Sequence, residues 1–138
     1  MIGDSVRTPQ YIIDYVKKHF GDYYDPCPYN PEFDKTKDKD GLLEDWGKVT
    51  YCNPPYSEVN KWVRKGHEEY KKGKTVIMLI KVRNLATIYA EKYMKEAEIV
   101  LLPKKIIFPG YKSYCRFGSV MLIYRANKVS GKFRFLYF

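Results

Sequence analysis

The chain has 138 residues, a length that predicts one domain with a hydrophobic core of its own. Hydrophobic residues make up 45% of the chain and charged residues 30%, which excludes a disordered protein, and no apolar run reaches the roughly 20 residues of a membrane span. Lysine and arginine number 25 against 16 acidic residues, for a net charge of +9, and aromatic residues reach 17%, so the composition favours a nucleic-acid partner.

The first predicted element is a helix over Pro9–Phe20. Thr8 is placed to cap this helix, and proline suits a first helical position. A short strand is expected at Asp22–Asp25, where Pro26 and Pro28 must end it because proline cannot donate to a strand ladder.

The middle of the chain contains a charged segment, a strand and a helix. Residues 34–40 are polar and nearly all charged, which predicts a solvated loop. A strand is expected at Lys48–Cys52, and an amphipathic helix from Ser57 to about Lys72, where Gly73 closes it.

The second half of the chain alternates strands with a helix. Thr75–Ile80 is a continuous apolar run, as expected of a strand buried on both faces. The further predicted elements are a helix at Asn84–Lys95, a strand at Glu98–Leu102, a candidate short strand at Lys104–Phe108, and strands at Ser119–Arg125 and Lys132–Leu136. We therefore predict an α/β fold with a mostly parallel sheet, helices on both faces and an antiparallel C-terminal hairpin formed by the last two strands.

The cysteines and histidines indicate neither disulfides nor a metal site. Cys27, Cys52 and Cys115 are odd in number and far apart, and the two histidines have no partner at zinc or triad spacing. Residues 1–4 lack the basic-then-apolar shape of a secretory signal. We expect free thiols, no metal and a cytoplasmic location.

The segment Asn53-Pro54-Pro55-Tyr56 stands directly between a predicted strand and a predicted helix, where ligands bind in open α/β sheets. Its two prolines fix the backbone and remove two N–H donors. The segment therefore presents acceptors, the Asn53 side-chain oxygen and the Pro54 carbonyl, beside the ring of Tyr56. That combination suits a flat group bearing an NH2, such as adenine; the alternative is a Pro-Pro turn with a packed tyrosine.

This segment resembles the Asn-Pro-Pro-Tyr motif of the amino-group methyltransferases that use S-adenosylmethionine. The wider pattern resembles the phage-type DNA N6-adenine methyltransferases. The likeness extends in order over nearly the whole chain, through Thr8-Pro9-Gln10, Asp25-Pro26-Cys27-Pro28, Asp40-Gly41-Leu42, Trp46, Trp62, Glu98-Ile99 and Phe108.

The resemblance implies a compact Rossmann-like methyltransferase fold over residues 1–138, without a separate target-recognition domain, and a phage or other viral origin, with the host cytoplasm as location. It implies methyl transfer to the N6 amine of adenine in DNA. By this likeness the catalytic residues are Asn53, Pro54, Pro55 and Tyr56: Asn53 and the Pro54 carbonyl accept the two N6 hydrogens, Tyr56 stacks on the base, and N6 attacks the methyl group directly.

The resemblance also implies a place for S-adenosylmethionine beside Asp25, Pro26 and Cys27. Thr8 and Pro9 would close over its methionine end, and Asp40 or Asp45 would accept from its adenine amine. The chain departs from most methyltransferases here, because it lacks a Gly-x-Gly loop and has only 25 residues between Cys27 and Asn53. Cys27 is expected in the pocket wall and not as a nucleophile.

The segment 104–117 mixes basic and aromatic residues and is the candidate DNA-binding region. Its expected contacts with phosphates and bases are Lys104, Lys105, Tyr111, Lys112 and Arg116. The alternative is a hydrated loop without a ligand.

Two other functions compete with adenine methylation in DNA. One is methylation of another amine: N4 of cytosine, adenine in RNA, or a protein glutamine. The net charge of +9 favours nucleic acid over a protein substrate. The other is a catalytically silent nucleic-acid-binding relative, which the missing glycine loop leaves open. The chain is expected to act as a monomer or homodimer.

Overall fold

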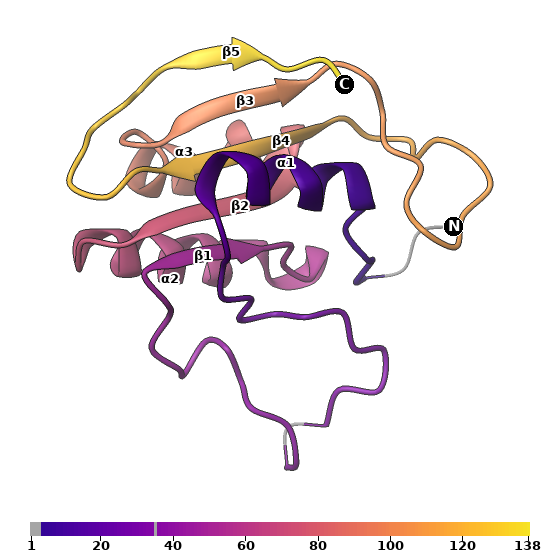
Figure 1. Ribbon diagram of the computed structural model, residues 1–138, viewed down its shortest axis with the longest axis horizontal. Helices are drawn as coiled ribbons and strands as arrows, with labels where there is room; N and C mark the ends of the chain where they lie inside the picture. Colours follow the sequence, from indigo (N-terminus) through magenta and orange to yellow (C-terminus); the bar gives the residue numbers. More distant parts are fainter. Residues whose placement is uncertain (1–3, 35) are drawn as a thin grey trace.

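The protein is a five-stranded sheet with helices on both faces (Figure 1). The structure, a computed structural model, describes residues 4–34 and 36–138, so the expectation about a secretory signal at Met1–Gly3 falls outside the described residues. The strands in sheet order are β1 (Val49–Cys52), β2 (Thr75–Lys81), β4 (Ser119–Tyr124), β3 (Glu98–Leu102) and β5 (Phe133–Phe135).

Four of the five strands run in the same direction. β1 pairs in parallel with β2 and β3 with β5, whereas β4 is antiparallel to both β2 and β3. The prediction of a mostly parallel α/β sheet is therefore confirmed.

The predicted C-terminal hairpin is wrong, because β3 lies between β4 and β5. Ile99 of β3 is in register with Phe133 of β5. All six residues of β4 are buried, which requires a partner on each of its edges, whereas β5 has exposed residues and suits the sheet edge.

The helices cover both faces, as predicted. α1 (Gln10–Phe20) lies in front of the sheet in Figure 1, and α2 (Val59–Lys71) and α3 (Ile88–Tyr93) lie behind it. Ile12 and Val16 of α1 belong to one hydrophobic cluster, and Trp62 and Val63 of α2 to the other. No helix among residues 4–34 and 36–138 is long and apolar enough to cross a membrane.

Three predicted elements differ from the structure. The strand at 22–25 is reduced to one parallel bridge between Tyr24 and Thr50. The helix at 84–95 is divided into a 3-10 turn (η2, Val82–Leu85) and the short α3. Residues 104–108 form no strand, since Pro103 and Pro109 bracket them; the Cys115 N–H instead donates to the Ile106 carbonyl at 3.0 Å.

This topology brings chemistry-bearing segments to one sheet edge. Tyr24 bridges β1 in parallel, and β1 is parallel to β2, so the residues that follow Tyr24, Cys52 and Lys81 leave the sheet at the same end. The connection between α1 and β1 extends away from the sheet beneath β1 (Figure 1).

Candidate active site

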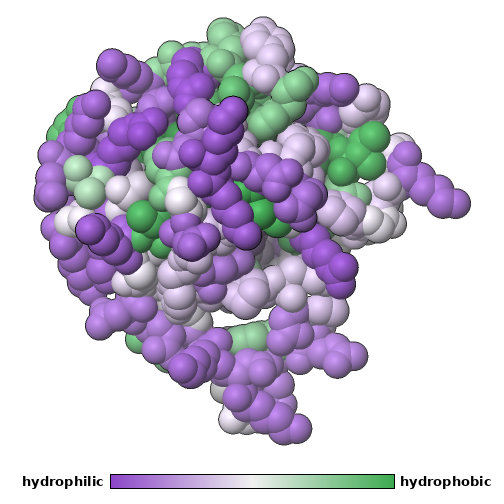
Figure 2. All heavy atoms as spheres, viewed as in Figure 1, coloured by the Kyte–Doolittle hydropathy of each residue, from purple (hydrophilic) through white to green (hydrophobic). Residues whose placement is uncertain are grey.

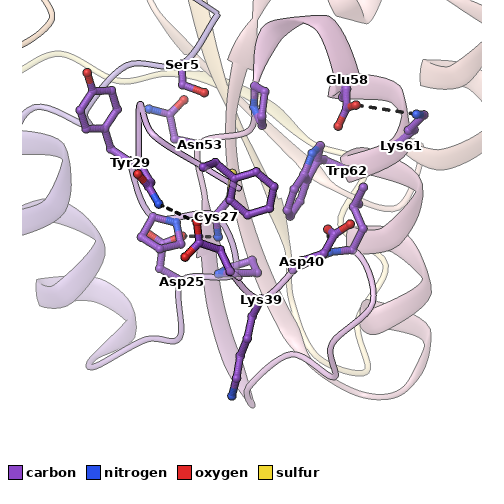
Figure 3. A pocket seen from close by; sticks show the side chains of 18 of the residues that line it. Ser5, Asp25, Cys27, Tyr29, Lys39, Asp40, Asn53, Glu58, Lys61 and Trp62 are labelled. Carbon is purple, nitrogen blue, oxygen red and sulfur yellow. Dashed lines mark hydrogen bonds and ion pairs between the residues drawn. The ribbon is translucent and has the colours of Figure 1, made fainter. Parts of the chain in front are cut away.

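A cavity of about 670 Å³ lies at the carboxyl end of β1. It is lined by residues of four segments: 4–6, 24–44, Asn53 with Pro55, and 57–62. Figure 2 shows the molecule hollowed between the sheet and the connection that precedes β1. Figure 3 shows Asn53, Asp25, Cys27 and Asp40 around this space.

Asn53, the first residue after β1, has a fixed amide orientation. Its Nδ2 donates to the Val6 carbonyl at 3.1 Å and to Thr8 Oγ1 at 3.2 Å. A carbonyl can only accept, so the NH2 group must face Val6, and Oδ1 is directed away from both partners. Because Asn53 lines the cavity, this arrangement presents an acceptor there.

The N-terminal segment also binds the residues that follow the prolines. The backbone carbonyl of Asp4 accepts the Tyr56 N–H at 2.9 Å. The Asp4 carboxylate accepts the Ser57 N–H and the Ser57 hydroxyl, both at 2.8 Å. Sequence reasoning missed Asp4 and Val6, since both act on residues about fifty positions away and neither belongs to a motif.

Tyr56 begins a 3-10 turn, η1 (Tyr56–Glu58), and is not one of the residues that line the cavity. The ring meets Phe117 edge to face with centroids 5.4 Å apart, and the Lys81 ammonium lies 4.2 Å from its centroid. Its hydroxyl is buried and has no hydrogen-bond partner among the described residues. Burial raises the pKa of Tyr56 well above its usual range, so the hydroxyl is neutral.

The opposite wall is formed by the Asp25–Cys27 turn. Asp25 Oδ1 accepts the Cys27 N–H at 2.9 Å. Burial raises the pKa of the Asp25 carboxyl from 3.8 to about 6, and this hydrogen bond opposes the rise.

This turn packs backbone to backbone against the segment at Gly41. A Cβ atom on Gly41 would lie 2.0 Å from the Pro26 carbonyl oxygen, so only glycine fits there. Trp46 Nε1 donates to the Gly41 carbonyl at 2.9 Å, which holds the segment in place. The Asp25–Cys27 turn and the segment at Gly41, both singled out by the sequence pattern, therefore form one packed unit.

Cys27 and Cys52 are free thiols beside each other in this wall. Burial, together with the neighbouring Cys27 thiol, raises the pKa of Cys52 well above its usual range. Cys52 is therefore a neutral thiol, and neutral thiols are poor nucleophiles.

The cavity is acidic although the chain is basic. Among the described residues the lysines that line it are Lys39 and Lys61, and Lys61 lies 3.8 Å from the Glu58 carboxylate (Figure 3). The acidic lining residues are Asp4, Asp25, Asp38, Asp40, Glu44 and Glu58. Among the described lining residues, six acids against two bases, in a chain with a net charge of +9, favour a cationic ligand in the cavity and disfavour a polyanion.

The predicted cofactor residues fall into two groups. Asp25, Pro26, Cys27 and Asp40 line the cavity, as do Asn53 and Pro55 of the predicted catalytic segment, whereas Pro54 is buried behind the lining.

The remaining predicted cofactor residues lie elsewhere. Thr8 does not cap α1, whose N-cap is the buried Pro9; its hydroxyl instead lies 2.9 Å from the Tyr51 hydroxyl and accepts from Asn53. Asp45 is exposed outside the cavity and pairs with Lys72 at 3.3 Å. The geometry thus favours Asp40 over Asp45 as a cavity acid.

The predicted DNA-binding residues lie on the loop between β3 and β4. Lys104, Lys105, Lys112 and Arg116 are exposed, and Tyr111 is half-buried. The same loop brings Phe117 against Tyr56, so these basic residues belong to the segment that contacts the Asn53–Tyr56 turn. Among the described residues no group of three His, Cys, Asp or Glu side chains is placed to hold a metal ion.

A family model described as DNA N-6-adenine-methyltransferase (Dam) matches residues 1–127. No curated protein matches the chain. Two solved structures are similar to part of it: one from Agrobacterium tumefaciens, described as a predicted O-methyltransferase, with 21% identity and a TM-score of 0.38, and one from Listeria monocytogenes, described as a class I S-adenosylmethionine-dependent methyltransferase, with 18% identity and a TM-score of 0.45. The matches cover 76% and 71% of this chain but 47% and 39% of those proteins, so the chain spans less than half of either.

Proposed function

The chain belongs to the DNA N-6-adenine-methyltransferase (Dam) family, and we propose that it transfers a methyl group from S-adenosylmethionine to the N6 amine of adenine in DNA. The family predicted from the sequence is confirmed. One structural observation carries the proposal for this chain: the Asn53 amide is held by Val6 and Thr8 so that an acceptor is left at the cavity.

Asn53 acts on the amine that is methylated. The N6 lone pair of adenine is delocalised into the ring, which makes it a poor nucleophile. An acceptor at Asn53 Oδ1, with the Pro54 carbonyl as the second, binds the two N6 hydrogens and favours a tetrahedral nitrogen. The rest of the rate enhancement is positioning, which supplies on the order of 7–11 kcal/mol in well-oriented reactions.

The acidic cavity fits S-adenosylmethionine, which when bound supplies a methyl group on a positively charged sulfur. Its volume of about 670 Å³ is that of a small-ligand site. Asp25 and Asp40 complement positive charge, and the rings of Trp62 and Phe33 provide apolar walls for a purine. A cavity at the carboxyl ends of strands is where Rossmann-like folds bind their cofactors.

The DNA backbone binds outside this cavity, on the basic loop between β3 and β4. A polyanion is repelled by the cavity acids and attracted by the exposed Lys104, Lys105, Lys112 and Arg116. Turning an adenine out of a duplex costs a few kcal/mol, and stacking on Tyr56 returns roughly 1–3 kcal/mol. Contacts with phosphates therefore supply the remainder.

The remaining proposals concern organisation and location. The described residues, 4–34 and 36–138, share one sheet with a hydrophobic cluster on each face, which supports a single minimal domain; we propose that it acts as a monomer or homodimer. Three free cysteines are typical of a reducing compartment, which supports the cytoplasm, that of the host for a protein of phage type.

Product analysis tests the proposed function. The protein is incubated with labelled S-adenosylmethionine and DNA from a methylation-deficient host, and the hydrolysed nucleosides are separated. The proposal predicts label in N6-methyl-2′-deoxyadenosine. Label in N4-methylcytosine would make cytosine the methylated base, and label only in RNA or in protein glutamine, offered in parallel reactions, would make one of these the substrate. Binding of S-adenosylmethionine without any product would indicate a silent relative.

A further inference from the structure

Lys81 is a cation at the Asn53–Tyr56 turn that the chemistry above does not use. It is the last residue of β2, the strand that pairs in parallel with β1. Its ammonium lies 4.2 Å from the Tyr56 ring centroid and 4.3 Å from that of Phe117. The side chain is half-buried, so its charge is partly removed from water.

This ammonium has no anionic partner in the described part of the chain. None of the ion pairs there includes Lys81. The Asp4 carboxylate, an acid near enough to act on it, is bound by Ser57 through two hydrogen bonds. Arg83 adds a second positive charge nearby, and both burial and Arg83 lower the pKa of Lys81.

The Lys81 ammonium covers the Tyr56 ring on which the target base is proposed to stack. The buried Tyr56 hydroxyl has no partner among the described residues, so the ring is held through its contacts with Lys81 and Phe117. A base that stacks on the face covered by Lys81 must displace the ammonium. The displaced ammonium remains beside the bound nucleotide, whose nearest anionic group is its phosphate.

Resting on the proposed function, we infer that Lys81, with Arg83 beside it, is a phosphate-binding residue for the target nucleotide. In the free protein the Lys81 ammonium covers the Tyr56 ring, and when DNA binds it moves to the phosphodiester next to the extruded adenine. A phosphodiester supplies the charge partner that the protein itself withholds. Lys81 thus couples stacking of the target base on the Tyr56 ring to binding of the DNA backbone.

Salt titration of DNA binding tests this inference with three variants on one duplex oligonucleotide. Lys81→Met keeps an apolar stem over the two rings and removes the charge; it is expected to weaken binding about tenfold at 0.1 M salt and to flatten the slope of log K against log salt by about one unit. Lys81→Arg is expected to retain the slope. Lys18→Met, an exposed position in the last turn of α1 with the same change of charge, is expected to match the wild type.

The outcomes separate this inference from the proposed function. A wild-type slope for Lys81→Met, beside normal methylation by the wild-type protein, would show that Lys81 only packs on Tyr56 and would overturn the inference. Absence of any methylation by the wild-type protein would overturn the proposed function. S-adenosylmethionine affinity, titrated in parallel, is expected to be unchanged in all three variants, which excludes a collapsed cavity as the cause.

Discussion

Gly41→Ala tests whether the cavity depends on the close approach of its two wall segments. The added Cβ would lie 2.0 Å from the Pro26 carbonyl oxygen and 2.8 Å from its carbonyl carbon. Both partners are backbone atoms, which cannot turn aside as a side chain can. The segments at Pro26 and Gly41 must therefore separate by about 1 Å or more to reach an ordinary contact distance.

The size of the effect follows from this displacement. Overpacking of this kind costs about 1–3 kcal/mol of the free energy of unfolding. Both segments line the cavity, and a misplacement of about 1 Å can reduce turnover on the order of 100-fold. We expect S-adenosylmethionine affinity to fall at least about tenfold and methylation kcat/KM about 100-fold.

Titration calorimetry with S-adenosylmethionine and urea unfolding measure these two effects. Gly21→Ala is the matched control: its added Cβ meets no atom within 4 Å, but its φ of 82° and ψ of −161° strain an alanine by about 1–3 kcal/mol. The control is expected to lose stability and keep its cofactor affinity. A Gly41→Ala protein with wild-type affinity and wild-type stability would refute the close approach.

Three further predictions concern single side chains. Folded Asp25 holds its proton up to about pH 6, whereas the unfolded chain releases it near 3.8, so the free energy of unfolding should decrease by at most about 3 kcal/mol as pH rises from about 4 to 6. The urea midpoint of Asp25→Asn should not show this pH dependence. Equal pH profiles for the wild type and the variant would contradict the raised pKa of Asp25. Cys27→Ser should reduce but retain methylation, as expected of a wall residue; an inactive variant that still binds S-adenosylmethionine, with a covalent DNA adduct on the wild type, would make Cys27 a nucleophile. Lys104→Ala and Arg116→Ala should each flatten the slope of log K against log salt for DNA binding by about one unit. Tyr56→Ala should lower the affinity for DNA and leave this slope unchanged. Unchanged slopes for both basic variants would place the DNA groove elsewhere on the surface.

Local sequence signals predicted most of the fold. The apolar run in β2 and the amphipathic period of α2 specify their own secondary structure, and both are found with small shifts at their ends. The pairing of β3 with β5 was not predictable in this way. It depends on β3 occupying the edge of β4 that β5 would otherwise pair with, which only the three-dimensional arrangement decides. A hairpin between β4 and β5 would satisfy the same local sequence pattern.

The residues of the candidate site likewise divide into those that local motifs predicted and those that depend on long-range contacts. Asn53 and Asp25 were identified because their motifs carry chemistry at recognisable positions. Asp4 and Lys81 were not, because their roles depend on contacts with Ser57 and Tyr56 that the sheet and the N-terminal segment create. Asp45 illustrates the converse, since its spacing suits the cavity but its side chain pairs with Lys72 in solvent.

The central claim is that Asn53 presents an acceptor to the amine that is methylated. Single-turnover methylation by Asn53→Ala, measured beside S-adenosylmethionine titration, tests it most directly, with Asn60→Ala on the exposed side of α2 as the matched control. The acceptor matters more in the transition state than in cofactor binding, so the rate should fall at least about 100-fold while cofactor affinity changes little and Asn60→Ala keeps the wild-type rate. A near-normal rate for Asn53→Ala, with N6-methyladenine as its product, would contradict the account.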